Sequence, residues 1–212
     1  MGVASHLKIQ IEEYDSRIRA FIPRYEEMLD SAACALKALG AGPGRIVDLG
    51  TGTGALTDAC ARIRHDFRFT VVDADIQILD IARARLSDRN IALTFIEANF
   101  LDVAIPECEA VVSSLALHHV KDSHAKEQLY RRLHDAIVPH GLLILADCFP
   151  AADTAIAEVE RQGWRAHLRR AYSHAEIEQL FASWAQEDCY LPLPTELGML
   201  HRAGFASDVV CD

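Results

Sequence analysis

The sequence predicts an α/β fold built on a mostly parallel sheet with helices on both faces. Two observations carry this prediction. Between residues 45 and 149, five apolar runs alternate with amphipathic stretches that have helical spacing. Apolar strands that alternate with such helices are typical of a parallel sheet covered on both sides. The chain has 212 residues, 50% of them hydrophobic, which is enough for one domain with a large core.

The elements follow in order along the chain. Residues 14 to 39 have helical periodicity, and the stretch "GAGPG" at residues 40–44 ends that helix. The predicted strands are "RIVDLG", "FTVVDAD", "IALTFIEAN", "EAVVSSL" and "LLILADCF". The predicted helices between them are "ALTDACARIR", "IQILDIARARL" and "SHAKEQLYRRLHDAIV", the last one broken by "PHG" at residues 139–141.

After Phe149 the strand pattern gives way to helices. Residues 153 to 170 and 173 to 186 read as two helices, and Ser173 and Glu176 have the spacing of a capping box. A shorter helix, "PTELGMLHRAG", and a last strand, "FASDVVCD", complete the chain. We therefore expect a single domain over residues 1–212, with residues 1–43 and 149–190 as segments that cap a pocket.

Composition excludes several classes of function. The net charge of −10 disfavours indiscriminate binding to nucleic acid or to anionic lipid. No apolar run is long enough to span a membrane, and the N-terminus lacks the apolar core of a signal peptide. The six cysteines form no CxxC pair, so neither zinc nor a redox dithiol is suggested and no metal is expected. A cytoplasmic location fits best, and a homodimer is left open.

The loop "VDLGTGTGAL", from Val47 to Leu56, follows the first predicted strand, where parallel sheets bind ligands. Its stretch "GTGTGA" satisfies the dinucleotide pattern GxGxxA, which alone is a weak match. A pyrophosphate would be repelled by the nearby carboxylate of Asp48. S-adenosylmethionine instead brings an ammonium and a sulfonium, which suit a carboxylate through a direct or water-mediated bond. The alternative is that the glycines only make a tight turn.

Asp73 ends the second predicted strand, where an acidic side chain can hold ribose hydroxyls. Both candidate ligands contain ribose, so Asp73 does not discriminate between them. Its alternative role is to cap the helix that begins near Ile76.

Six ordered motifs together resemble class I S-adenosylmethionine-dependent methyltransferases: "IVDLGTGTGAL", "VVDADIQILDIARARL", "FIEANFLD", "VVSSLALHHV", "IVPHGLLILAD" and "LHRAGF". The resemblance covers roughly residues 14 to 212 and implies a Rossmann-like sheet of order 3-2-1-4-5-7-6, its seventh strand antiparallel. This chain ends soon after "FASDVV", so we expect the seventh strand to be missing.

The resemblance also implies roles for particular residues. Gly50, Thr51 and Gly52 would line the methionine part of the cofactor. Asp73 would bind ribose with Ala74 beside it. Asn99 would bind the adenine amino group, with Phe100 packed on the base, and Ser114 would face the sulfonium end. The family more often has Asp at position 99, but an amide oxygen can also accept from an amino group.

A narrower resemblance concerns carboxy-S-adenosylmethionine synthase and its relatives, through "YDSRIRAFIPRYEEML" and "YSHAEIEQLF". It implies that Tyr25 touches the cofactor, whereas the alternative is a buried helix aromatic. The synthase holds its extra carboxylate with an arginine, and the aligned position here is Met199. Plain S-adenosylmethionine is therefore the better candidate.

The implied reaction is an in-line displacement that methylates a small-molecule substrate and releases S-adenosylhomocysteine. His118 and His119 follow the fourth strand and are candidates for a general base, with packing as the alternative. Aromatic residues in the second cap segment suggest an apolar or aromatic substrate: Trp164, Tyr172, Trp184 and Tyr190. On one helix face, Arg161, Arg165 and Arg169 could receive an anion, although a solvated face balanced by glutamates fits better. The rival functions are a non-catalytic cofactor-binding scaffold and an NAD(P)-dependent oxidoreductase.

Overall fold

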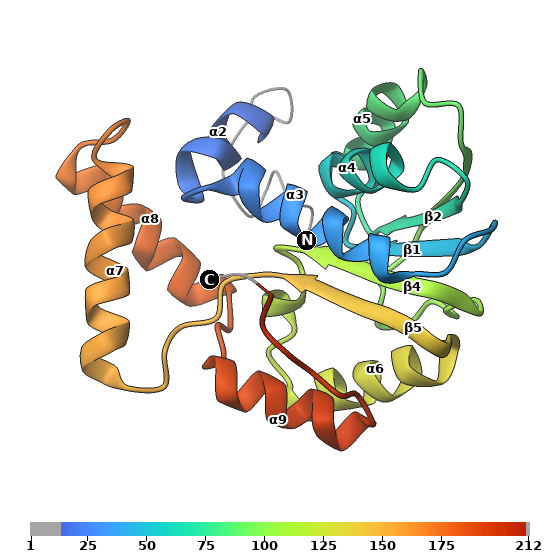
Figure 1. The fold of residues 1–212 in the computed structure, drawn as a ribbon. Coiled ribbons are helices and arrows are strands. Elements are labelled where there is room, and N and C mark those ends of the chain that lie inside the picture. The colour runs from blue at the N-terminus through green and yellow to red at the C-terminus, as the bar shows by residue number, and fades with distance from the viewer. Residues whose placement is uncertain (1–13, 211–212) are drawn as a thin grey trace.

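The computed structural model describes residues 14–210, and its centre is a parallel sheet (Figure 1). Five strands lie in the order β3-β2-β1-β4-β5 over the described residues. Their bounds are β1 (Arg45–Leu49), β2 (Arg68–Asp73), β3 (Ala92–Glu97), β4 (Cys108–Ser114) and β5 (Ile137–Ala146). Each neighbouring pair is parallel. The predicted α/β class and the first five positions of the expected strand order are confirmed.

Helices follow the strands, and acidic side chains cap several of them. The connecting helices are α4 (Ala55–Ile63), α5 (Ile76–Leu86) and α6 (Ser123–Ala136), with a short 3-10 turn, η3 (Leu117–His119), after β4. Asp75 accepts the backbone N–H of Gln77 at 3.0 Å, and Asp122 accepts that of His124 at 2.8 Å. These bonds satisfy N–H groups that the first helical turn leaves without partners.

Strand residues alternate between the two faces and build a core on each. On one face Ile46 packs with α4 and with α3 (Tyr25–Ala35). On the other face Val47 and Leu49 pack with α6 and with α9 (Leu193–Ala203). Figure 1 shows α3 and α4 above the sheet and α6 and α9 below it. The layered arrangement leaves the ends of the strands free for a site.

The predicted helix over residues 14 to 39 is wrong as one element. It is divided into α2 (Tyr14–Phe21), α3 and the short η2 (Leu36–Ala38). Pro23 interrupts it because proline has no N–H for the helix ladder and restricts the residue before it. Arg24, which follows, has a φ of 54° in the left-handed region. The break turns α2 away from the direction of α3.

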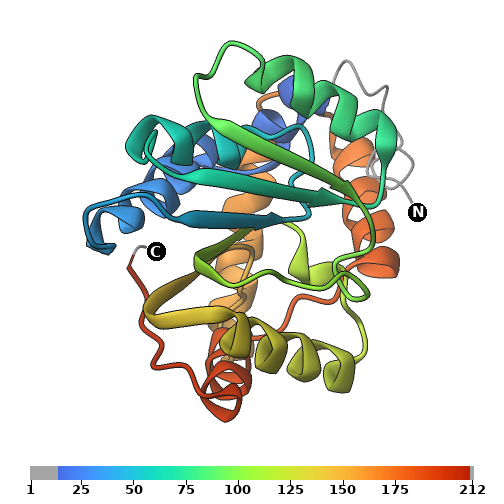
Figure 2. The ribbon, with the colours of Figure 1, turned by 90° about the vertical axis from the view of Figure 1, so that its right-hand side faces the viewer.

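The two predicted cap helices stand at the carboxyl ends of the strands. They are α7 (Thr154–Leu168) and α8 (His174–Glu187), and the expected capping box of Ser173 and Glu176 is present. Figure 1 shows both helices on the side to which the arrowheads of β4 and β5 point, and in Figure 2 α7 stands behind the sheet. Phe21 of α2 contacts the ring of Trp184 at 5.4 Å between centroids. Trp164 Nε1 donates to the carbonyl oxygen of Phe21 at 2.6 Å.

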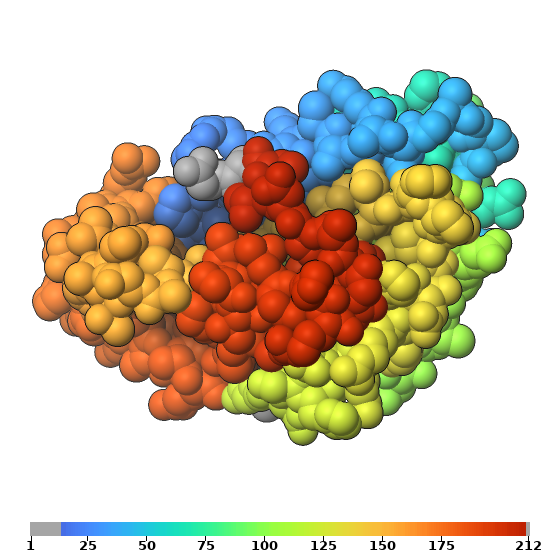
Figure 3. All heavy atoms as spheres, turned by 60° about the horizontal axis from the view of Figure 1, so that its bottom comes forward, coloured from blue at the N-terminus to red at the C-terminus, as the bar shows by residue number. Residues whose placement is uncertain are grey.

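The predicted last strand is wrong over residues 205–210, which form no strand, and residues 211–212 lie outside the described part of the chain. Val209 and Val210 are 44% and 77% exposed. Figure 3 shows the C-terminal part, in red, at the surface. A valine-rich stretch becomes a strand only when a neighbouring strand pairs with it. In residues 14–210 there is no helix of sufficient length and apolarity to cross a bilayer.

Candidate active site

A cavity of about 430 Å³ opens at the carboxyl ends of the strands, within the range of small-molecule pockets. Its walls come from α2, from the loops after β1 to β4, and from the second cap segment. Nine of the ten residues expected to bind the cofactor line it: Tyr25, Gly50, Thr51, Gly52, Asp73, Ala74, Asn99, Phe100 and Ser114. Both histidine candidates, His118 and His119, line it as well.

The glycine loop turns sharply from β1 into α4 and lies against the end of β2. The backbone N–H groups of Gly50 and Thr51 both donate to the carbonyl oxygen of Val72, at 2.9 and 3.0 Å. Gly50 and Gly52 have φ values of 65° and 55°, which favour glycine. A Cβ at Gly50 would collide with Ala116, whereas one at Gly52 would meet no atom within 4 Å. The space beside Gly52 can therefore receive a ligand close to the backbone.

Asp73 lies beneath this space and fixes the loop. Its two carboxylate oxygens accept the N–H of Gly52 at 2.9 Å and the N–H of Asp75 at 3.0 Å. Burial raises the pKa of Asp73 above its ordinary value, and the bonds from Gly52 and Asp75 partly offset that rise. A carboxylate oxygen has more than one acceptor position, so each can still receive a ligand hydroxyl.

Asp48, the tenth residue expected to bind the cofactor, is not part of the cavity wall. Asp48 is 0% exposed and does not line the cavity, because strand alternation turns its side chain toward α4. Its Oδ2 accepts the hydroxyls of Thr51 at 2.8 Å and Thr57 at 2.5 Å. Burial raises the pKa of Asp48 to about 6. Asp48 acts on the loop from below, through Thr51.

Helix α2 covers the glycine loop with contacts that the sequence did not predict. Asp15 accepts the hydroxyl of Thr53 at 2.7 Å and also pairs with Arg85 of α5. Tyr14 lines the cavity, and burial raises its pKa to about 12. Periodicity identified this stretch as a helix, but nothing in it indicated which of its polar side chains face the loop.

His118 and His119 of η3, which line the cavity, form a cluster with two carboxylates. His118 Nδ1 is 2.5 Å from Asp147 Oδ1, and His119 Nδ1 is 3.1 Å from Asp188 Oδ1. Burial alone would lower the pKa of His118, but the charge and hydrogen bond of Asp147 outweigh burial and raise it. Tyr190 donates to Asp188 Oδ2 at 2.5 Å. Asp147 directly follows β5 and could have been suspected, whereas nothing pointed to Asp188.

The other residues that the sequence singled out fall into two groups. Trp164, Trp184 and Tyr190 line the cavity, while Tyr172 packs beside Phe21 outside it. The arginines of α7 do not line it: Arg161 pairs with Glu158 and Arg165 with Glu178. Met199 is buried in the core between α9 and the sheet.

Comparisons with known proteins agree with this geometry. Residues 46–141 match the family model of the methyltransferase domain. The carboxy-S-adenosyl-L-methionine synthase of Aeromonas hydrophila is 27% identical over 204 residues, covering 92% of this chain and 80% of that protein. The synthase of Aeromonas salmonicida is 27% identical over 203 residues, covering 92% and 81%. These matches support an S-adenosylmethionine-dependent enzyme with S-adenosylmethionine as its cofactor.

Solved structures share the fold. Human N-acetylserotonin methyltransferase in complex with S-adenosylmethionine superposes with a TM-score of 0.57 at 20% identity, over 84% of this chain and 46% of that one. This chain therefore spans about half the length of the human protein. A methyltransferase structure from Bacillus halodurans gives 0.60 at 20% identity, over 85% and 70%. Residues 46–141 thus match the methyltransferase domain, and the chain as a whole resembles the class I S-adenosylmethionine-dependent methyltransferases.

Proposed function

We propose that the chain transfers the methyl group of S-adenosylmethionine to a small-molecule acceptor held in the cavity beneath α7 and α8. One observation carries the proposal. Residues at the carboxyl ends of four different strands, including Gly52, Asp73, Asn99 and Ser114, all line the same cavity. When bound, S-adenosylmethionine supplies an activated methyl group and leaves as S-adenosylhomocysteine.

The chain's own residues would hold the cofactor in an extended arrangement along the strand ends. The open space at Gly52 would admit the methionine part, and Asp73 would accept the ribose hydroxyls. Asn99 Oδ1 accepts the N–H of Leu101 at 2.9 Å and retains a second acceptor position for an amino group. Phe100 would pack on the base, and Tyr25 and Ala74 would close the sides.

The acceptor would lie at the opposite end, among Trp164, Trp184, Tyr190 and the two histidines. Aromatic walls favour a flat or apolar molecule, and the cap would exclude water from it. Alignment of the acceptor with the methyl group can itself contribute about 7–11 kcal/mol to the barrier reduction. We include the cap segments, residues 1–43 and 149–190, in this proposal; residues 1–13 lie outside the described part.

The nature of Met199 favours plain S-adenosylmethionine over its carboxylated form. An arginine would be needed there to hold an extra carboxylate in the manner of the synthase resemblance. Met199 is 5% exposed and packs in the core. The chain therefore offers no cation at that position.

Calorimetry with S-adenosylmethionine, S-adenosylhomocysteine, carboxy-S-adenosylmethionine and NADH tests the cofactor, and we expect the first two to bind. Tight binding of NADH alone would contradict the proposal and favour an oxidoreductase. Release of S-adenosylhomocysteine over a panel of small aromatic acceptors tests turnover. Binding with no turnover for any acceptor would favour the scaffold function instead.

A further inference from the structure

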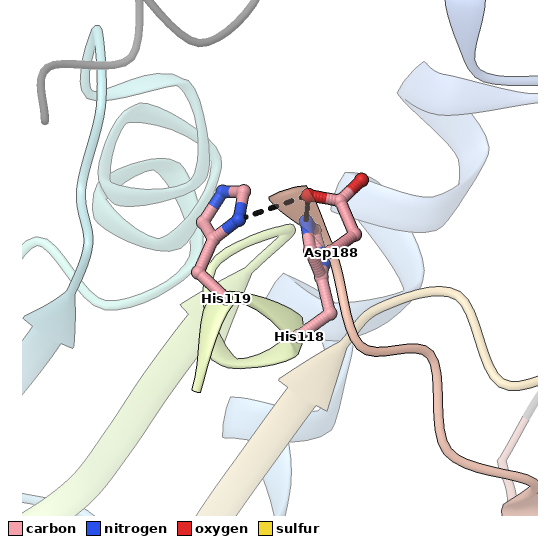
Figure 4. A group of neighbouring side chains, drawn as sticks. All are labelled: His118, His119 and Asp188. Atoms are coloured by element: carbon pink, nitrogen blue, oxygen red, sulfur yellow. Dashed lines mark ion pairs between the residues drawn. The ribbon is translucent and has the colours of Figure 1, made fainter. Parts of the chain in front are cut away.

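Three side chains with metal-binding atoms meet at the acceptor end of the cavity. His118 and His119 belong to η3, and Asp188 follows α8 (Figure 4). One ligand atom from each lies within 4.8 Å of the others. His118 Nε2 is 3.8 Å from Asp188 Oδ1, and His119 Nδ1 is 3.1 Å from the same oxygen. Both imidazoles thus face one carboxylate oxygen, as Figure 4 shows.

A second layer of polar groups orients this cluster. Asp147 Oδ1 lies 2.5 Å from His118 Nδ1, and it favours the tautomer in which that nitrogen carries the proton. His118 Nε2, the nitrogen on the Asp188 side, then presents a lone pair. Tyr190 donates to the other oxygen of Asp188 at 2.5 Å, which aims Oδ1 at the histidines. In metal sites, a ligating histidine usually hydrogen-bonds a carboxylate through its other ring nitrogen, and a ligating carboxylate usually accepts a hydrogen bond from a nearby donor.

The donor atoms of this arrangement converge on one point. His118 Nε2 and His119 Nδ1 both lie within 4 Å of Asp188 Oδ1. Two imidazole nitrogens and one carboxylate oxygen are donors that suit zinc and its neighbours, whereas Mg²⁺ and Ca²⁺ prefer oxygen alone. At bond lengths of about 2.1 Å, tetrahedral ligand atoms lie roughly 3.4 Å apart. The two separations to Asp188, 3.1 and 3.8 Å, lie on either side of that value.

We propose that His118, His119 and Asp188 bind one divalent transition-metal ion of the zinc type, with a coordination position left open toward the cavity. The His119 side chain is 35% exposed, so the ion is reachable from the cavity, while those of His118 and Asp188 are 9% and 1% exposed. The search for cysteine motifs could not find this site, because none of its three ligands is a cysteine and Asp188 lies far along the chain from the two histidines.

The open position would select the acceptor. A hydroxyl, thiol or carboxylate of the acceptor could bind there, and a bound hydroxyl or thiol would lose its proton more easily. This use of the ion rests on the proposed function, whereas metal binding itself does not. A substrate that combines an aromatic ring with such a group would match both the tryptophans and the ion.

Metal binding is tested with the full chain after treatment with a chelator. Zn²⁺ alone is titrated by calorimetry, and Co²⁺ alone by its visible absorption. We expect one saturable site. His119→Gln should weaken Zn²⁺ affinity at least tenfold, and Asp147→Asn, which removes an outer support, should weaken it about 10- to 100-fold. His201→Gln, at an exposed histidine of α9, is the matched control and should leave the affinity unchanged.

X-ray absorption at the zinc edge of the unmodified protein gives an answer that needs no variant, and two imidazole ligands are expected. Absence of a saturable site, or affinities that His119→Gln and Asp188→Asn leave unchanged, would overturn the metal site. Binding of S-adenosylhomocysteine is measured in parallel in the presence of chelator. If it persists while Zn²⁺ fails to bind, only the metal inference is lost; if it fails while Zn²⁺ binds, only the proposed function is lost.

Discussion

Replacing Asp48 by Asn should change how the stability of the fold depends on pH. Asp48 is fully buried within β1, and Oδ1 has no hydrogen-bond partner among the described residues. Burial raises its pKa from 3.8 to about 6, and hydrogen bonds from Thr57 and Thr51 offset only part of that rise. The ionised form is therefore the costly one in the folded protein. Asn keeps the shape and an acceptor for both hydroxyls but does not titrate.

The sign follows from the raised pKa. The contribution of Asp48 to stability is complete below the unfolded pKa of 3.8 and is lost as pH rises through about 6. A difference of about two pH units corresponds to about 3 kcal/mol in all, of which about 2 kcal/mol falls between pH 4.5 and pH 8. Over that interval the unmodified protein should lose about 2 kcal/mol of unfolding free energy relative to Asp48→Asn.

Urea unfolding of both proteins at pH 4.5 and pH 8 measures this difference. Every other titrating group is common to the two proteins, so comparing their pH responses isolates position 48. The absolute stability of the variant does not matter to the test, because any cost of its buried amide N–H is present at both pH values. Equal changes in unfolding free energy between the two pH values would refute the reasoning. A variant whose unfolding free energy falls relative to that of the unmodified protein as pH rises would refute it as well.

Four further predictions concern the cofactor, the cap and the core. Asp73→Ala should weaken S-adenosylhomocysteine binding some ten- to hundredfold by calorimetry, because charge-assisted bonds to ribose contribute about 1.5–3 kcal/mol; an unchanged dissociation constant would reduce Asp73 to a loop anchor. Gly52→Val should abolish that binding while the protein stays folded by circular dichroism, because its side chain would occupy open cavity space; normal binding would move the site elsewhere. Hydrogen exchange in residues 14–43 and 149–190 should slow when S-adenosylhomocysteine is added, and protection confined to the loops at Gly50 and Asp73 would contradict a closing cap. Lys126→Met should lower the unfolding free energy by about 3–5 kcal/mol, because it removes the Nζ that lies 2.9 Å from Glu196 and leaves that carboxylate buried without its cation. A loss below about 1 kcal/mol in urea unfolding would show that Glu196 takes up a proton or water instead.

Residues beside the strands were predictable because topology fixes where strands end. The apolar runs located five strands, and parallel order brings their carboxyl ends to one edge, so Gly52, Asp73 and Ser114 could be assigned to one cavity before any coordinates. Asp48 does not line the cavity because it lies inside the strand, where alternation rather than position along the chain decides which face a side chain occupies. The strand at residues 205–210 failed because β-propensity has no effect without a partner strand.

The acceptor end could not be predicted in the same way. Asp188 and Tyr190 reach the histidines because the segment after α8 joins η3, where the N–H of Cys189 donates to the carbonyl oxygen of His118 at 2.8 Å. The angle at which a cap helix packs leaves no local signal in sequence. The helices themselves were predictable from periodicity and from the capping box at Ser173. Their placement depends on distant contacts such as the one between Trp164 and Phe21.

The bond from Trp164 to the carbonyl of Phe21 joins α7 to α2, and Asp15 joins α2 to Thr53 in the glycine loop. A motion that lifts α7 must either break the first bond or carry α2 with it, and a displaced α2 pulls on the second. The exit of a methylated product and the exit of S-adenosylhomocysteine would then share one mechanical linkage. One opening motion of α7 and α2 would then release both products, instead of a separate motion for each. The product that dissociates second would leave from a cavity that is already open.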